Sequence, residues 1–191
     1  AAYNNQTEAG ISTGDASTLM NCAAYDNNGS ATTSYGIDAS SGSTVIGCLA
    51  SLNTNDNATP NQSAVGINPL FGTLIKDCMA RGNEGSGIQV NSDCRVLQNN
   101  CDGNQMSGIR IASNDNRIEG NHVTDSPIGL EVDFADNFII GNTASGNTIN
   151  YEIVAGNKVG VIVDAPDSLA ISGSTGGAGV GTANPWANFS F

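Results

Sequence analysis

Basic and aromatic residues are both scarce in this chain of 191 residues. Lysine and arginine together number 6 against 18 acidic residues, the net charge is −12, and aromatic side chains make up 5%. No basic stripe is available to neutralise phosphates, so the composition predicts no nucleic-acid partner. No apolar run is long enough to cross a membrane, so no membrane insertion is expected. The plain role of the excess acid is to keep the surface soluble.

Glycine, in contrast, is abundant and falls at a fixed period. Blocks of 21 residues begin at Gly66, Gly87, Gly108, Gly129 and Asn150. Each block opens with alternation of apolar and polar residues, as in Ile109-Arg110-Ile111, which is typical of a strand with one buried face. Two further short apolar stretches follow in each block. Three short strands per turn form a core only when successive turns stack, so the period predicts a solenoid.

Stacked turns place equivalent residues in columns. The inward column of the first strand is predicted to be Ile11, Ile37, Ile67, Ile88, Ile109, Leu130 and Tyr151. A corner column is predicted to be Cys22, Cys48, Cys78, Asn99, Asn121 and Asn142. Stacked asparagine amides can hydrogen-bond from turn to turn, and a buried cysteine fills space as a small apolar side chain. The leading glycines and the later Asn83, Asn104 and Asn147 are expected to turn corners, because both residue types tolerate left-handed backbone angles.

With these columns the sequence resembles right-handed parallel β-helix proteins of the pectin-lyase-like superfamily, in which many members bind or cleave carbohydrates. The resemblance covers residues 1–163 and rests on the repeated Gly-Ile starts, the inward Ile/Val columns and the asparagine ladder. It implies an all-β, right-handed solenoid of about seven turns, the handedness being taken from the family. The superfamily includes lyases, hydrolases, epimerases, tailspikes and adhesins, so it implies no single activity.

The five cysteines do not have the spacing of a metal or redox motif. They are Cys22, Cys48, Cys78, Cys94 and Cys101, an odd number without a Cys-x-x-Cys pair, which argues against a zinc or redox site. The first three should lie roughly 4.8 Å apart along their column. A disulfide between neighbours is geometrically open, but free buried thiols are expected, because stacked parallel side chains do not naturally meet the disulfide dihedral.

The two ends of the chain depart from the repeat. Residues 164–191 are expected to form a Gly-rich segment that ends in Trp186, Phe189 and Phe191. This tail resembles the ends of secreted bacterial β-helix proteins, which implies an extracellular or cell-surface location. Aromatic side chains need burial, so the tail either caps the solenoid or joins copies of the chain, with a trimer as the form the family suggests. The first residues match the middle of a later turn, so the chain is expected to be part of a longer protein.

Two early turns are longer than the repeat. The extra residues fall around Asn28–Tyr35 and Thr54–Val65, on the same edge of the solenoid. Insertions on one face of a solenoid often form its binding face. The simpler interpretation, which is favoured, is that they are tolerated surface loops.

The outward column of the first strand carries the best candidates for chemistry. Glu131 and Glu152 lie one turn apart, a spacing that resembles the carboxylate pair of a retaining glycosidase. With Asp133 or Asp136 the same carboxylates could hold Ca²⁺, the one metal considered. The simpler interpretation is a solvated acidic face.

The remaining polar candidates do not converge. His122 is the only histidine and is expected to be a surface residue, because a general base needs an oriented partner and a pocket. The six basic residues are not expected to share one column beside an acidic cluster, although Arg95 and Arg117 can stack. This pattern argues against a pectate-lyase site.

Three functions are carried forward. The favoured one is a non-catalytic extracellular β-helix module, structural or glycan-binding, that belongs to a larger secreted or surface protein and has polysaccharide as its expected partner. The first alternative is a polysaccharide lyase or glycoside hydrolase that uses Glu131 and Glu152. The second is an ice-binding solenoid, which is disfavoured because the outer columns are not flat threonine arrays. Apart from Ca²⁺, no cofactor is expected.

Overall fold

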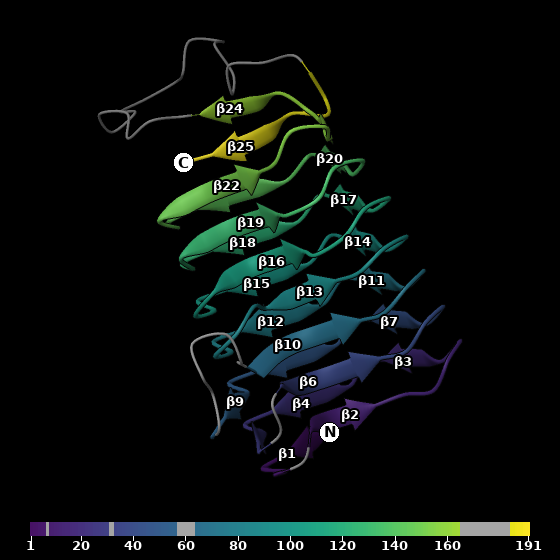
Figure 1. The fold of residues 1–191 in the computed structure, drawn as a ribbon. Coiled ribbons are helices and arrows are strands. Elements are labelled where there is room, and N and C mark those ends of the chain that lie inside the picture. Colours follow the sequence, from purple (N-terminus) through teal and green to yellow (C-terminus); the bar gives the residue numbers. More distant parts are fainter. Residues whose placement is uncertain (7, 31–32, 57–63, 165–183) are drawn as a thin grey trace.

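The computed structural model describes residues 1–6, 8–30, 33–56, 64–164 and 184–191. Every regular element in these ranges is a strand, and none of the described residues forms a helix able to cross a membrane. The strands wind into a right-handed parallel β-solenoid of about seven turns, as the repeat predicts (Figure 1).

Three parallel sheets run along the solenoid, and we name them sheets A, B and C. Sheet B contains β2 (Ala9–Ser12), β6 (Ser34–Ala39), β10 (Ala64–Pro69), β13 (Ile88–Val90), β16 (Ser107–Ile111), β19 (Ile128–Val132) and β22 (Ile149–Ile153). Sheet C contains β3 (Thr18–Met20), β7 (Thr44–Ile46), β11 (Leu74–Lys76), β14 (Arg95–Leu97), β17 (Arg117–Glu119), β20 (Phe138–Ile140) and β23 (Lys158–Val159). Sheet A contains β1 (Ala2–Tyr3), β4 (Ala23–Tyr25), β8 (Leu49–Ser51), β12 (Met79–Arg81), β15 (Asn100–Asp102), β18 (His122–Thr124), β21 (Thr143–Ser145), β25 (Asn188–Ser190) and β24 (Ile162–Asp164).

The core is the stack of inward columns, and the predicted first-strand column is confirmed. Ile67 pairs with Ile37 and Ile88, and Ile109 pairs with Ile88 and Leu130. These five side chains are at most 1% exposed. Each fully buried side chain of this size stabilises the fold by about 1.5–3 kcal/mol. Only the end members of the column, Ile11 and Tyr151, are partly exposed.

The predicted corner column forms a hydrogen-bonded ladder between sheets C and A. The backbone N and the Nδ2 of Asn99 both donate to Asn121 Oδ1, at 2.9 and 3.0 Å. Asn121 donates in the same way to Asn142 Oδ1, at 3.0 and 2.9 Å. The backbone N of Cys78 donates to Asn99 Oδ1 at 2.9 Å, so the cysteines continue the column. These buried amides therefore satisfy one another, which offsets the cost of taking them out of water.

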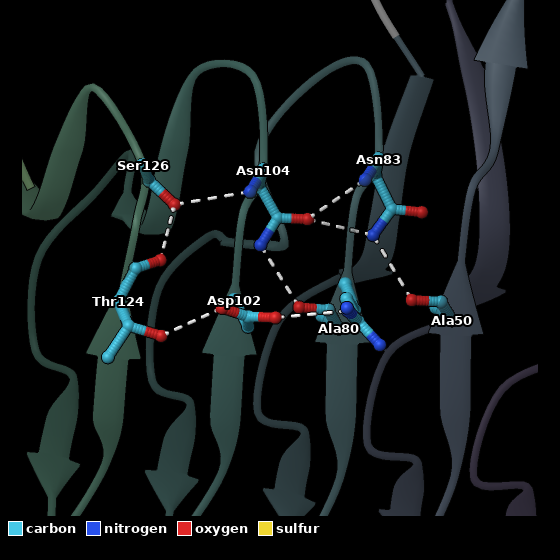
Figure 2. Close-up of polar contacts among 8 residues, drawn as sticks. Ala50, Ala80, Asn83, Asp102, Asn104, Thr124 and Ser126 are labelled. Carbon is cyan, nitrogen blue, oxygen red and sulfur yellow. Dashed lines mark hydrogen bonds and ion pairs between the residues drawn. The ribbon is translucent and has the colours of Figure 1, made fainter. Parts of the chain in front are cut away.

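Two further ladders occupy the other corners, and the repeat analysis did not identify them as ladders. One, between sheets A and B, consists of Asn5, Asn27, Asn53, Asn83, Asn104, Ser126 and Asn147. The other, between sheets B and C, includes Cys94, Asn116, Asn137 and Asn157. Figure 2 shows Asn104 between Asn83 and Ser126 in the first of these ladders. Hydrogen-bonded columns thus hold all three corners of the triangular cross-section.

The expectation that the leading glycines and the ladder asparagines adopt left-handed backbone angles is wrong. The left-handed residue is the one directly before each ladder position, for example Gln98 with φ of 56° and Leu52 with φ of 55°. Gly87 is needed for another reason: a Cβ there would lie 2.6 Å from Gly108 O and 2.7 Å from Asn104 Nδ2. The glycine column therefore makes room for the ladder and the next turn.

The two insertions begin side by side. Asn28–Gly29 (β5) pairs with Thr54–Asn55 (β9), so both depart from the same edge of the solenoid. Residues 31–32 and 57–63 lie outside the described residues. A binding role for these insertions stays a prediction.

The C-terminal residues form part of sheet A. β25 pairs with β21 on one side and β24 on the other. Within the single chain Trp186 and Phe191 are 54% and 58% exposed, and the buried positions of the segment belong to Ala187 and Asn188. Burial of these aromatic side chains against another copy of the chain stays a prediction. The glycine-rich residues 165–183 lie outside the described part.

The five cysteines are free thiols with unequal accessibility, which gives a testable order of reaction. Cys22 is half-buried, whereas the other four are at most 2% exposed. Burial also raises the pKa of the Cys94 and Cys101 thiols, which lowers their thiolate fraction. A hydrogen bond with the Cys78 thiol lowers the pKa of Cys48, but Cys48 is only 2% exposed. We expect iodoacetamide to modify Cys22 alone in the native protein and the other four after unfolding, as mapped by peptide mass. Modification of Cys48 ahead of Cys22 would contradict this packing.

Candidate functional site

The outer face of sheet B holds the carboxylates singled out from the sequence, and an arginine occupies the space between two of them. Arg110 Nη2 and Nε both lie 2.9 Å from Asp133 Oδ2, and Arg110 Nε lies 3.7 Å from Glu131 Oε2. Ser107 Oγ also donates to Glu131 Oε2. Glu131 is thus held in a closed network of one cation, one hydroxyl and a second carboxylate.

The contacts within this network occupy carboxylate oxygens that catalysis or metal binding would use. Glu131 and Glu152 are neighbours in the register, as the period predicts. However, no group of three or more acidic, histidine or cysteine side chains in the described residues is arranged to hold a metal ion. Glu131, Asp133 and Glu152 therefore do not form the Ca²⁺ site considered from the sequence. Asp136 lies at a corner with φ of 64°, where a small polar residue suits the turn.

The outer face of sheet A carries His122 and a second ion pair. His122 lies between Asn100 and Thr143, as expected, and its Nδ1 is 2.7 Å from Thr143 Oγ1. Arg81 Nε lies 3.0 Å from Asp102 Oδ2, and Thr124 Oγ1 donates to Asp102 Oδ1 at 3.0 Å, a contact drawn in Figure 2. Both Asp102 oxygens are therefore engaged, and His122 has a hydroxyl as its partner where a general base usually has a carboxylate.

The outer face of sheet C differs because basic and aromatic side chains gather there. Strand register aligns Arg95, Arg117, Phe138 and Lys158 in one column. Lys76 projects from the same sheet, so four of the six basic residues lie on it. Arg95 and Arg117 are neighbours in the register, as the sequence allowed, and Lys158 joins their column through β20, which the sequence spacing did not reveal.

A groove of about 490 Å³ opens at the C-terminal end of this face. It is lined by residues of sheet C and the chain just after it, Arg117, Phe138, Ile140 and Lys158–Gly160, and by Asn184 and Trp186 from the C-terminal segment. Phe138 is 38% exposed and Trp186 54% exposed. Large exposed apolar surfaces on a soluble protein commonly mark a binding site.

The charges in the groove are arranged to meet an anion. The Arg117 guanidinium carbon lies 5.1 Å from the centre of the Phe138 ring, and its Nε donates to Glu119 Oε2 at 2.7 Å. These contacts fix the plane of the guanidinium and leave its terminal nitrogens as donors. Among the described residues, no carboxylate lies within ion-pair distance of Lys158. Arg117 is thus paired with Glu119, and Lys158 is the groove's basic side chain without an ion-pair partner among the described residues.

Sequence reasoning missed this groove for a physical reason. Trp186 was assigned to a cap or to oligomer contacts because it lies beyond the repeat. It lies in the turn just before β25, which follows residues 165–183 in the chain, and no periodic signal predicts where β25 docks. The available signal was the asparagine two residues after Trp186, since Asn188 has the residue type of the ladder.

A three-sided parallel solenoid with asparagine ladders at its corners defines the class of protein. The family model for the right-handed β-helix region matches residues 63–176, more than half of the chain. The chain belongs to this right-handed β-helix family.

Solved structures of two other proteins are similar. The A-module of the mannuronan C-5 epimerase AlgE6 from Azotobacter vinelandii has a TM-score of 0.50 and 14% identity, over 75% of this chain and 52% of that one. The Dettilon tailspike protein has a TM-score of 0.43 and 16% identity, over 77% of this chain and 41% of that one. The chain therefore spans about half of their length or less, and the likeness to the epimerase establishes the fold alone. No curated protein sequence matches the chain.

Proposed function

We propose that the protein is a non-catalytic β-helix module that binds an acidic polysaccharide in the groove on sheet C. The observation that carries the proposal is the convergence of Arg117, Lys158, Phe138 and Trp186 on one groove. A uronate ring has an apolar face and a carboxylate. The aromatic side chains offer a surface for the first, and the basic side chains offer charge-assisted hydrogen bonds to the second.

The same reasoning disfavours the enzymatic alternative that uses Glu131 and Glu152. A general acid must be free to give its proton to the leaving group, whereas Glu131 is engaged by Ser107 and Arg110. Because acidic polysaccharides lie outside cells, a binding module of this kind would act in a secreted or cell-surface protein, as expected for a bacterial relative of the family.

The proposal predicts a specific pattern of affinities for tetragalacturonate. Trp186→Ala and Arg117→Met are each expected to weaken binding at least tenfold, about 1.4 kcal/mol, by isothermal titration calorimetry. Arg81→Met is the matched control: it removes the same charge from the outer face of sheet A and is expected to leave affinity within about twofold. Binding should weaken between 0.05 and 0.5 M salt, because partly exposed ion pairs are screened.

Two outcomes would count against the proposal. A neutral oligosaccharide of the same length that binds as tightly would remove the role of Arg117 and Lys158. Shortening of the tetragalacturonate during incubation would show catalysis, and the module would then be an enzyme.

Self-association through the tail is a separate proposal. Trp186 and Phe191 expose enough apolar surface to contact another copy, as the trimer expectation requires. Light scattering on the full chain tests it, and a monomer mass at high protein concentration would exclude it.

A further inference from the structure

The position of β25 in sheet A does not follow the order of the strands along the chain. After β23 the chain forms β24, which by sequence would be the next strand beside β21. β24 instead lies one place further out, and β25, from the end of the chain, lies between the two. Figure 1 shows this yellow strand between β24 and the body of the solenoid.

Both edges of this segment are hydrogen-bonded. On the inner side Phe189 N donates to Asn142 O at 2.8 Å, and Phe191 N donates to Ala144 O at 3.1 Å. On the outer side Asn188 N donates to Val161 O at 2.8 Å. The Tyr151 hydroxyl donates to Phe189 O at 2.8 Å. The segment is thus hydrogen-bonded on both edges like any inner strand of the sheet, although residues 165–183 separate it in sequence from β24.

Asn188 completes the corner ladder between sheets C and A. The backbone N and Nδ2 of Asn142 donate to Asn188 Oδ1 at 2.9 and 3.0 Å, and Asn188 Nδ2 donates to Gly160 O at 3.0 Å. Asn188 is 0% exposed. Without it, Asn142 loses the acceptor for two donors, which is costly for a buried group.

Gly160 is adapted to the returning strand. A Cβ at this position would lie 2.1 Å from Trp186 O, a backbone atom held in place by its bond from Gly141 N. No side chain larger than hydrogen fits while the segment is docked. Trp186 and Asn184 line the groove together with Phe138 and Lys158, so the groove has these two lining residues only when the C-terminal segment is in place.

We infer that the slot between β21 and β24 is a strand-binding site for the C-terminal segment, and that docking of this segment assembles the glycan groove. The inference rests on the proposed function. Asn188 acts as a positioning residue, since it holds the segment that carries Trp186 and does not line the groove, whereas Gly160 both lines the groove and leaves room for the segment. By linkage, a ligand that binds only the assembled groove stabilises the docked strand, and loss of docking lowers the apparent affinity.

Hydrogen exchange on the full chain tests this coupling. The amides of Phe189 and Phe191 are bonded inside sheet A and do not line the groove. Saturating tetragalacturonate is expected to slow their exchange at least tenfold in the wild type. In Trp186→Ala the same amides should stay protected without ligand and show no further slowing, because the strand docks but the ligand is lost.

Gly160→Ala tests the same coupling from the other side, because it disturbs docking of the segment. It should speed exchange at Phe189 and Phe191, change the fluorescence of Trp186, the only tryptophan, and weaken ligand binding at least tenfold. Exchange in β13 and β16 should be unaltered, which separates undocking from unfolding. Gly14→Ala is the matched control, since no atom lies within 4 Å of a Cβ there, and it should behave as wild type.

The outcomes separate the two proposals. If the wild type does not bind tetragalacturonate, the proposed function fails and the coupling fails with it. If the wild type binds but exchange at Phe189 and Phe191 does not change, or if Gly160→Ala binds equally well, only the coupling is overturned.

Discussion

Replacing Asn121 with alanine is expected to lower the midpoint of thermal unfolding by roughly 10 °C. The substitution removes the acceptor of two buried donors, Asn99 N and Asn99 Nδ2, and the donor to Val96 O. Leaving a buried polar group unpaired costs about 1–3 kcal/mol, so the variant should lose about 3–4 kcal/mol. For a chain of this length, each kcal/mol lowers the midpoint by about 2–4 °C.

Asn100→Ala is the matched control for this prediction. Asn100 is the first residue of β15, and its side chain is exposed on the outer face of sheet A. Its replacement should change stability by no more than about 0.5 kcal/mol. Differential scanning calorimetry measures both variants, and equal midpoints would mean that the ladder does not hold the corner.

Gly87→Ala is expected to destabilise the protein by about 3 kcal/mol through overpacking. The new Cβ would lie 2.6 Å from the backbone oxygen of Gly108, in the adjacent turn, and 2.7 Å from Asn104 Nδ2 in a ladder. Neither atom can move without breaking a hydrogen bond, since Asn104 donates to Ala80 O. Alanine also restricts the unfolded chain, which alone would stabilise the protein by about 0.4–1 kcal/mol, so the steric effect decides the sign.

Gly14→Ala measures the effect on the unfolded chain without the steric effect. The space around a Cβ at Gly14 is open, so only the unfolded-chain effect should remain and stability should stay equal or rise slightly. Urea unfolding of the two variants gives the comparison. A Gly87→Ala protein as stable as Gly14→Ala would contradict the close approach of successive turns.

Much of the fold could be predicted because a solenoid repeats one physical solution. The period of 21 places Ile67, Ile88 and Ile109 over one another, and the structure has that register. The residues with left-handed angles were misassigned by one position or more: they directly precede the ladder residues, and most of them are Gly, Asp or Asn, such as Gly103 and Asp115. The ladder of Cys94, Asn116 and Asn137 was also overlooked, although its members recur with the period of the repeat.

The candidate site was harder to predict because it combines residues from distant parts of the chain. The repeat specifies the alignment of Glu131 with Glu152 and with Arg110, but not the contact of Arg110 with Asp133. The groove depends on Trp186, whose location follows from a strand that enters sheet A out of chain order. Periodicity predicts neighbours within the repeat and gives no information on a segment that returns to it.

A crystal structure of the full chain with tetragalacturonate tests the central claim most directly. The account predicts an intact oligosaccharide in the groove on sheet C, with a ring against Trp186 and carboxylates beside Arg117 and Lys158. An oligosaccharide on sheet B over Arg110 and Glu131, or a shortened one, would contradict a non-catalytic module that binds through sheet C.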